Sequence, residues 1–508
     1  MGVWLLDVEA GQTWRFATEP VSWGGNAYLD GLDVSGDFLD ELATSLPSER
    51  SASVVIHGQA RSELDAEDLS LGAVGVLYYW QDPGGADDPI ALIKGRLVNP
   101  VYGAADEPLE ATVREVPWMD RGLIPAPEAA INDDTWPARD PSSGIDDEVY
   151  PVVIGEPGRT DVMGSPAYYA QTGVTDYVLL AGHPVIAGTV TVYDRTGAVS
   201  NSLTVSTVAD GLNRNVAVGD ATAWAALNQG DELWAVWDNG GGLANPEDHA
   251  RALTGAGDLI EWLLHRSTIR VDWGRLRAAK ARLNAYRIDT YIQGHPGERV
   301  SPWAWISEHL LPILPVMVRS SAAGLYLAVL DVSAPVGVAR GRLEEGRNCD
   351  RISMVETVGT GDVANDIEFH YAPRSDGDTM AAVVRVTGSG AVLDTFDDAV
   401  RSSVCEESVR RFGRITRSLT TTAIYDGSTA VRLATALAAR SALPPRQVVY
   451  SLRDGSGLES LEPGDTVRLT DSGLGWSGRS AVVWSVRVGT PYELTLRLYR
   501  SHGRDSAP

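Results

Sequence analysis

Cysteine is nearly absent from this chain, which has only Cys349 and Cys405 among its 508 residues. Two thiols cannot build a framework of disulfides, and these two lack the paired spacing of a zinc or iron–sulfur site. One bridge between them is an alternative, but we expect two free, buried thiols. A disulfide-rich scaffold and a cysteine-based metal centre are therefore excluded.

Long hydrophobic runs are also missing. The first apolar run, Val3 to Leu6, is too short for the hydrophobic region of a secretory signal, so we expect folding in the cytoplasm. The longest apolar stretch, 310–330, is interrupted by two prolines, an arginine and two serines. Because a transmembrane helix needs about 20 predominantly apolar residues, we expect no membrane span.

No motif in the sequence demands catalysis. The chain lacks GxSxG, HExxH, CxxC and GxxxxGK[ST], and its eight histidines never stand at metal-ligand spacing. The segment VGTGDVAND, at 358–366, lacks the third glycine of a nucleotide-binding fingerprint, and we expect a turn before a strand there. We therefore predict no catalytic, cofactor-binding or metal-binding residue, and we predict that the protein is not an enzyme.

Two groups of neighbouring carboxylates invite comparison with a glycosidase, which needs two carboxyl groups at a set separation. They are Asp133 with Asp134, and Asp146 with Asp147 and Glu148. Both groups stand among Pro, Ser and Asn residues, in a segment without sustained periodicity. We therefore expect solvated linker residues rather than a catalytic pair.

Negative charge dominates the chain, whose formal net charge is −26. Residues 1–150 hold 8 bases and 28 acids, so that 8 − 28 = −20 of this charge lies there, whereas residues 251–287 hold eight bases and three acids. Such acidity disfavours non-specific binding to nucleic acid and to anionic membranes. The basic helix expected within 266–287 has few aromatic residues, so we expect it to meet an acidic face of the same or a neighbouring subunit.

Short β-branched and aromatic runs, bounded by turn residues, predict strands in three regions: 1–120, 147–238 and 447–500. In LEATVREV, at 109–116, Leu109, Ala111 and Val113 share one face, which indicates a half-buried antiparallel strand. The fold class is therefore α+β, mainly β, and the length suggests three or four domains.

Helices are expected only after Asn245, which together with Pro246 resembles a helix start. A second helix at about 274–286 is expected to turn Arg275, Lys280 and Arg282 towards solvent. A third begins at about Ser301, and a fourth covers 428–441 with Ser428 as its cap.

One internal similarity stands out. Aligned without gaps, 93–115 and 476–498 share six identical residues: Gly95 with Gly478, Arg96 with Arg479, Pro108 with Pro491, Glu110 with Glu493, Thr112 with Thr495, and Arg114 with Arg497. Any two β-hairpins can look this alike, so a chance similarity stays an alternative explanation. If the similarity is real, the chain carries two copies of one β-barrel at its two ends.

Several segments resemble the baseplate or tail hub proteins of tailed bacteriophages and of gene transfer agents. The carboxy-terminal part carries most of this resemblance, with a helix, a strand and then L-x-P-G-D-x-V-x-L-T-D at 461–471. YPVVIGEPG at 150–158, WLLHRSTIRVDWGRL at 262–276 and VANDIEFHYAP at 363–373 are similar to further hub segments. The order of the segments is more specific than any one of them.

The resemblance implies a homotrimer in which each subunit contributes two tail-tube-like barrels to a ring with pseudo-sixfold symmetry. Such a ring adapts a six-fold tail tube to a three-fold tip of the virion tail. Its implied partners are the distal tail or tube protein, the tape measure protein, and spike or fibre proteins. DNA would meet it only while passing through the lumen. Three copies carry 3 × (−26) = −78, and we expect acidic lumen walls to repel DNA phosphates.

The resulting organisation has five segments. They are a first tube-like barrel at 1–120, a Pro- and Asp-rich linker at 121–146, an inserted β-rich domain at 147–240, a mixed α+β domain at 241–400, and a helix with the second tube-like barrel at 401–508. A module like 147–240 is absent from compact contractile hubs, so the chain is closer to the larger, long-tailed type. The alternative function is a glycan-binding or glycan-hydrolysing multidomain β-protein, which predicts soluble monomers that bind cell-wall or capsule sugars.

Overall fold

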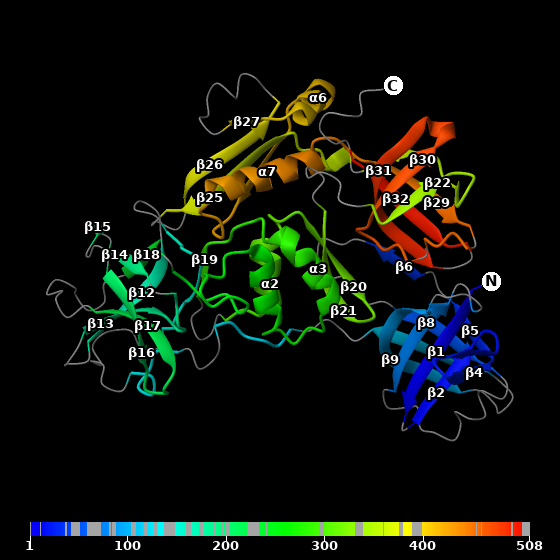
Figure 1. The fold of residues 1–508 in the computed structure, drawn as a ribbon, viewed down its shortest axis with the longest axis horizontal. Helices are drawn as coiled ribbons and strands as arrows, with labels where there is room; N and C mark the ends of the chain where they lie inside the picture. The colour runs from blue at the N-terminus through cyan, green and yellow to red at the C-terminus, as the bar shows by residue number, and fades with distance from the viewer. Residues whose placement is uncertain are drawn as a thin grey trace.

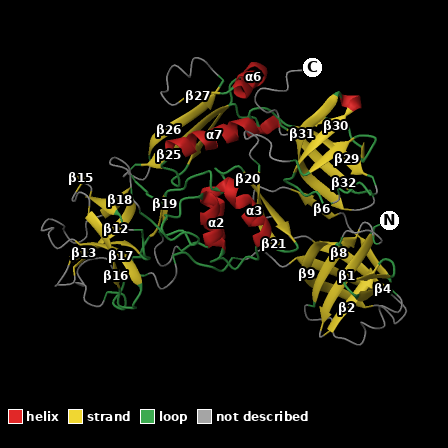
Figure 2. Cartoon of the chain, viewed as in Figure 1, coloured by secondary structure: helices red, strands yellow, loops and turns green. Residues whose placement is uncertain are grey.

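The computed structural model of the chain is mainly β, as the sequence predicts, and it includes a closed six-stranded barrel and a half-barrel (Figures 1 and 2). It describes residues 2–10, 12–35, 38–41, 51–57, 73–80, 83, 88–102, 108–115, 120–125, 130–136, 148–158, 164–171, 176–186, 188–194, 197–198, 203–220, 233–239, 241–293, 299–330, 339–358, 360–374, 379–388, 399–453, 455–458, 460–488 and 491–499. The domain boundaries stay a prediction.

Nine strands form the N-terminal sheet, in the order β3-β4-β2-β1-β8-β9-β10-β7-β5. They are β1 (Val3–Ala10), β2 (Gln12–Ala17), β3 (Val21–Trp23), β4 (Asn26–Asp30), β5 (Leu32–Ser35), β7 (Ser51–Ile56), β8 (Val74–Trp80), β9 (Ile90–Tyr102) and β10 (Leu109–Glu115). The expected alternation in β10 is confirmed, because Leu109, Ala111 and Val113 are buried while Glu110 and Arg114 are exposed.

The closed barrel lies in the inserted β region. Its sheet has the order β15-β14-β16-β17-β13-β12-β18, and an additional pairing of β14 with β18 closes six of these strands on themselves. The strands are β12 (Ser165–Gln171), β13 (Asp176–Ala181), β14 (Thr189–Asp194), β15 (Gly197–Ala198), β16 (Leu203–Ala209), β17 (Asn215–Asp220) and β18 (Leu233–Asn239). Closure removes strand edges from this part of the chain.

A mixed region follows, in which one hydrophobic cluster joins helices and two small sheets. The cluster includes residues of α2 (Ala256–Leu264), α3 (Trp273–Leu283), α4 (Pro302–Trp305), a π-helical turn at Ile306–Leu310, α6 (Ser403–Phe412) and α7 (Gly427–Ser441). One sheet is the hairpin β20 (Val316–Ser321) and β21 (Gly324–Val329). The other has the order β27 (Ala399–Arg401), β26 (Met380–Thr387), β25 (Asp366–Pro373) and β28 (Thr416–Thr420), and α7 packs on it. A two-stranded pairing of β11 (Val152–Ile154) with β19 (Thr290–Ile292) ties the inserted region to this one.

Two helix starts differ from the prediction. Asn245 does not begin a helix: its side chain accepts a hydrogen bond from the Glu247 amide in a turn, and α2 starts later, at Ala256. Helix α7 is capped by Asp426, whose carboxylate accepts from the Thr429 amide, while Ser428 donates to the same carboxylate. Ser301 caps α4 as expected. Among the described residues, no helix is long and apolar enough to cross a membrane.

The C-terminal sheet has the order β22-β30-β31-β32-β29-β23. Its strands are β22 (Gly341–Glu344), β23 (Cys349–Arg351), β29 (Arg446–Leu452), β30 (Thr466–Asp471), β31 (Trp476–Val488) and β32 (Glu493–Leu498), and β24 (Glu356–Thr357) also pairs with β29. The short strand β6 (Phe38–Glu41), from the other end of the chain, pairs with the second half of β31. One hydrophobic cluster contains side chains of both end sheets, which lie next to each other at the lower and upper right of Figure 1.

The two end sheets share a five-strand topology. The N-terminal sheet contains β8-β9-β10-β7-β5, and the C-terminal sheet contains β30-β31-β32-β29-β23, with the same chain order of the strands. Every neighbouring pair in both sets is antiparallel. The sixth position differs, because β1 pairs antiparallel with β8 whereas β22 pairs parallel with β30. The chain therefore repeats one architecture at its two ends, and the hairpin similarity reflects it.

The gapless alignment is nevertheless wrong for the first strand of each hairpin. Arg114 pairs with Arg96, whereas Arg497, its equivalent on the last strand, pairs with Val482. The two first strands therefore match only after a shift of three residues. Gly95 and Gly478 are identical residues that do not occupy equivalent positions. Gly95 packs against the Arg114 backbone and leaves no room for a Cβ atom, whereas Gly478 lies in open space at φ 61°.

Both thiols are free and buried, as expected. Burial raises the pKa of the Cys349 thiol to about 12, and it also raises the pKa of Cys405. We expect neither thiol to react with Ellman's reagent at pH 8 in the folded protein, and both to react in 6 M guanidinium chloride. Reaction of one thiol in the native state would show that its strand or helix opens.

Candidate functional site: a charged junction

The L-x-P-G-D segment forms the turn that leads into β30, and its backbone is hydrogen-bonded to Val483 of β31. The Gly464 amide donates to the Val483 carbonyl over 2.7 Å, and the Val483 amide donates to the Asp465 carbonyl over 2.9 Å. Gly464 has φ 94°, a conformation that favours glycine. The Asp465 carboxylate accepts from the Glu462 amide and from Arg340. These hydrogen bonds and the ion pair hold the turn, and with it Glu462, in place.

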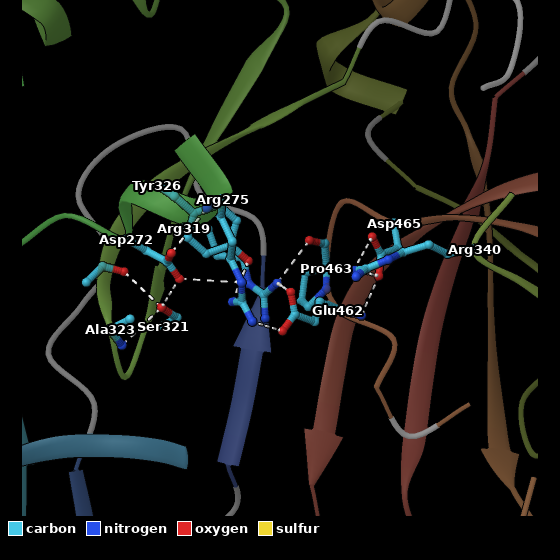
Figure 3. Close-up of polar contacts among 11 residues, drawn as sticks. Asp272, Arg275, Arg319, Ser321, Ala323, Tyr326, Arg340, Glu462, Pro463 and Asp465 are labelled. Carbon is cyan, nitrogen blue, oxygen red and sulfur yellow. Dashed lines mark hydrogen bonds and ion pairs between the residues drawn. The ribbon is translucent and has the colours of Figure 1, made fainter. Parts of the chain in front are cut away.

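Two arginines of the mixed region converge on Glu462 (Figure 3). Arg275, from α3, donates to one of its carboxylate oxygens. Arg319, from β20, lies 3.3 Å from the other oxygen and also donates to the Pro463 carbonyl. The Arg319 side chain is only 5% exposed, and the Glu462 carboxylate compensates for part of the cost of burying its positive charge.

Side chains of the β20–β21 hairpin hold the two arginines in place. The Tyr326 ring lies 5.1 Å from the Arg275 guanidinium and 5.3 Å from that of Arg319. Asp272, the cap of α3, contacts Arg275 and accepts a 2.8 Å hydrogen bond from Ser321. We call the set Asp272, Arg275, Arg319, Tyr326 and Glu462 the charged junction, because it joins the mixed region to the C-terminal sheet.

The position of Lys280 contradicts our prediction that this side chain is turned towards solvent. Its side chain is only 13% exposed rather than turned to solvent, and its ammonium nitrogen lies 2.7 to 2.8 Å from carboxylate oxygens of Glu247, Asp258 and Glu261. Burial alone would lower the pKa of Lys280, but hydrogen bonds to these carboxylates outweigh it and raise the pKa. Arg277 also pairs with Glu261. The cationic helix thus meets acidic groups of its own chain.

Asp471, the last residue of the L-x-P-G-D-x-V-x-L-T-D segment, is fully buried at the end of β30. Its side chain accepts 2.7 Å and 3.1 Å hydrogen bonds from the Tyr450 hydroxyl and the Leu474 amide, and Arg351 lies 3.6 Å away. Burial and the bond to Asp471 both raise the pKa of Tyr450.

We expect Asp471→Leu to lower the free energy of unfolding by about 2 to 4 kcal/mol, because the buried Tyr450 hydroxyl and the partly buried Leu474 amide each lose their acceptor. Urea unfolding measures this loss. In the double variant Asp471→Leu/Tyr450→Phe the hydroxyl is gone too, so part of the stability should return. A single variant as stable as the parent would contradict the assigned role.

The structure describes three of the five carboxylates that were weighed as a catalytic pair. Asp133 and Asp134 are exposed in a turn that Asn132 stabilises through its side chain, and Asp146 and Asp147 lie outside the described residues. Glu148 accepts a hydrogen bond from Tyr168. In 358–366 a short 3₁₀ turn precedes β25, as expected. In the described ranges no three His, Cys, Asp or Glu side chains are placed to hold a metal ion.

Sequence reasoning missed the most buried ion pair among the residues that the structure describes. Asp366, fully buried at the start of β25, receives two hydrogen bonds of 2.8 and 2.6 Å from Arg385 and one of 2.8 Å from Thr416, and Arg414 lies 2.8 Å away. Burial would raise the pKa of Asp366, but these partners outweigh it and hold the pKa below its usual value. The only available signal was Asp366 within VANDIEFHYAP, a segment quoted for its resemblance.

The chain is similar to solved structures of tail proteins. The 43 kDa tail protein of prophage MuSo2 from Shewanella oneidensis is 10% identical, with 98% of each chain covered and a TM-score of 0.33. A tail protein from Neisseria meningitidis is 11% identical, with 98% of this chain and 96% of that chain covered and a TM-score of 0.35. A chain of a native gene transfer agent virion is 13% identical over 71% of this chain and 86% of that one, at a TM-score of 0.39. No protein-family model matches the sequence, and no curated protein matches it. These neighbours are tail and virion proteins, the class that the sequence resembles.

Proposed function

We propose that the protein is a structural, non-enzymatic hub of a phage-type tail tip. Three copies form a ring in which each contributes its two end sheets, so that a three-fold assembly presents six similar units to the tail tube. The ring surrounds the channel through which DNA leaves. Its partners are the tube or distal tail protein above it, the tape measure protein, and a spike or fibre protein below it.

The shared five-strand topology of the end sheets is the observation that carries this proposal. A six-fold tube offers six equivalent contact sites, and three identical subunits can match them only if each subunit offers two similar units. Strand β6 and the common hydrophobic cluster join the two units within one chain. The repeated topology thus supports an adaptor between two symmetries.

The charged junction supports a mechanical role. It anchors the turn before β30 to α3 and to the β20–β21 hairpin, with a buried arginine at its centre. A hub transmits load between the tube and the tip, and ion pairs with fixed partners resist relative movement of the parts they join. The negative charge of the chain favours free passage of DNA, because acidic walls repel phosphates.

Native mass spectrometry of the purified chain and of isolated tail tips tests this function. We expect a species of three chains, 3 × 54.3 kDa = 162.9 kDa, either in solution or after assembly. The glycan-binding alternative predicts a monomer under all conditions that is retained on cell-wall polysaccharide. A monomer that is absent from purified tail particles and binds such sugars would overturn the hub proposal.

A further inference from the structure

The end of α6, the loop after it and the first residues of β28 form one continuous basic surface. Every residue of 410–418 is exposed, and this segment contains four arginines and no acidic residue. Its Phe412 and Ile415 are 43% and 38% exposed. We call residues 410–418 the basic face. Such a concentration of positive charge stands out in a chain whose formal net charge is −26.

The loop within the basic face has a fixed shape. Gly413 ends α6 with φ 74°, and the fully buried Asn365 binds the loop at two residues. The side-chain amide nitrogen of Asn365 donates to the Gly413 carbonyl over 2.8 Å, and its side-chain oxygen accepts from the Ile415 amide over 2.8 Å. The Asn365 backbone amide also donates to the Ile415 carbonyl over 3.0 Å. Because the loop is already ordered, it loses little conformational freedom when it binds a partner.

The positive charge of the basic face is only partly compensated. Arg411 and Arg414 each have a carboxylate partner. Arg410 and Arg417 form no ion pair with any residue that the structure describes, although both are exposed. The basic face therefore presents two uncompensated guanidinium groups beside two exposed apolar side chains.

This combination favours a protein partner over DNA. Arginine and aromatic side chains are enriched in protein interfaces, and exposed apolar side chains that lie together mark such interfaces. Interfaces with DNA are more polar, because most contacts go to phosphates and sugars. The partner of the basic face should therefore be a protein surface that has apolar side chains among carboxylates.

The hairpin of β3 and β4, at the other end of the chain, belongs to a surface of this kind. Residues 19–33, which include the hairpin, contain three acids and no Arg or Lys, and residues 82–90 contain three aspartates and no Arg or Lys. The Trp23 indole on β3 donates to the Asp88 carboxylate over 3.2 Å. The two acidic segments thus lie side by side.

Apolar side chains are exposed among these carboxylates. Leu29 and Ile90 are 38% and 36% exposed, and Glu19, Asp30 and Asp88 are exposed as well. We call these five residues the acidic face. Like the basic face, it combines two exposed apolar side chains with charges of one sign.

We propose that the basic face of one copy binds the acidic face of a second copy of the chain. The two faces do not meet within one copy, because α6 lies at the top of Figure 1 and β4 at its lower right, with the C-terminal sheet between them. Opposite charges on two surfaces steer and orient their association. The contact is head-to-tail, and such contacts close into rings when the rotation between copies allows it. The inference rests on the proposed ring and names two surfaces that join its copies.

Charge reversal in the full chain tests the contact. We expect Arg410→Glu/Arg417→Glu to weaken self-association about tenfold or more in sedimentation velocity, because carboxylates would then face carboxylates. Glu19→Arg/Asp30→Arg should weaken it to a similar extent. The chain with all four substitutions has exchanged the charges of the two faces, so its self-association should return to within about threefold of that of the parent.

Arg121→Glu/Arg342→Glu is the matched control, since it changes the net charge equally at exposed arginines outside both faces. It should associate like the parent. Circular dichroism checks that each variant is folded, and recovery in the fourfold variant shows the same for the reversed arginines. The inference is overturned if neither double reversal weakens association, if the fourfold variant recovers nothing, or if the parent stays monomeric in low salt at its highest soluble concentration.

Two further measurements separate the inference from its alternatives. A labelled DNA duplex, followed by fluorescence anisotropy, should not bind the parent. Binding that is lost in Arg410→Glu/Arg417→Glu would assign the basic face to DNA and overturn the inference. If tail particles incorporate this variant as well as the parent, the hub function stands and the proposed contact is wrong. If tail particles lack the parent chain, the hub function fails, whereas recovery of the fourfold variant in solution would still support the contact.

Discussion

Asp366→Asn is expected to lower the free energy of unfolding of the four-stranded sheet region by about 3 kcal/mol. The substitution keeps the shape of the side chain but removes the buried carboxylate charge that faces the guanidinium of Arg385, while the more exposed Glu368 stays 2.9 Å away. Removing one member of a buried pair is costly because the other charge stays desolvated. Hydrogen exchange of the β25 amides and the first thermal transition measure the effect.

The same carboxylate predicts a pH dependence with a definite sign. The pKa of Asp366 lies below its value of about 3.9 in an unfolded chain. Its contribution to stability is therefore complete above about pH 4, and it is lost as the pH falls through the lower, folded-state pKa. We expect the difference between the parent and Asp366→Asn to be constant from pH 5 to 7 and to shrink below pH 4.

Asp350→Asn is the matched control, since Asp350 forms a similar two-bond pair with Arg453 but is nearly half exposed. Pairs at the surface contribute little, because solvent screens them. A loss of stability in Asp350→Asn as large as in Asp366→Asn would show that burial is not the cause.

Glu462→Ala is expected to lower the free energy of unfolding by about 2 to 3 kcal/mol and to loosen the charged junction. The variant leaves Arg319 buried without its carboxylate, with the Pro463 carbonyl still in reach. We expect faster proteolysis in the segments that flank the C-terminal sheet, measured by limited trypsin digestion.

A double-mutant cycle with Arg319→Met distinguishes charge from packing. Methionine fills a similar volume without a charge, so the double variant Glu462→Ala/Arg319→Met should recover part of the lost stability. Additive losses would show that Arg319 and Glu462 do not act as a pair. Glu493→Ala removes the partner of Arg487, an arginine that is 46% exposed where Arg319 is 5% exposed, and should cause little change.

Local patterns predicted the strands well because alternation is a local property. The alternation of buried residues with more exposed ones in β10 and β32 follows the sequence directly, and the helices at α3 and α7 were expected from their apolar faces. The helix cap at Asn245 was wrong because an Asn side chain stabilises a tight turn as readily as a helix start.

Pairings between distant segments could not be predicted in this way. The four residues of β6 carry no signal for a partner more than 400 positions away, and the burial of Lys280 depends on Glu247, Asp258 and Glu261, which the fold gathers around it. The gapless hairpin alignment failed because the loops between the paired strands differ in length, so identities on the first strands no longer mark equivalent positions. The role of Glu462 likewise depends on two arginines from other parts of the chain.

A cryo-electron microscopy map of the tail tip, reconstructed with three-fold symmetry only, tests directly whether the protein is an adaptor between six-fold and three-fold symmetry. We expect a ring of six similar β units that alternate between the first hundred and the last sixty residues of three chains. A ring whose six units all come from one end of six chains, or a tip without this protein, would be incompatible with it.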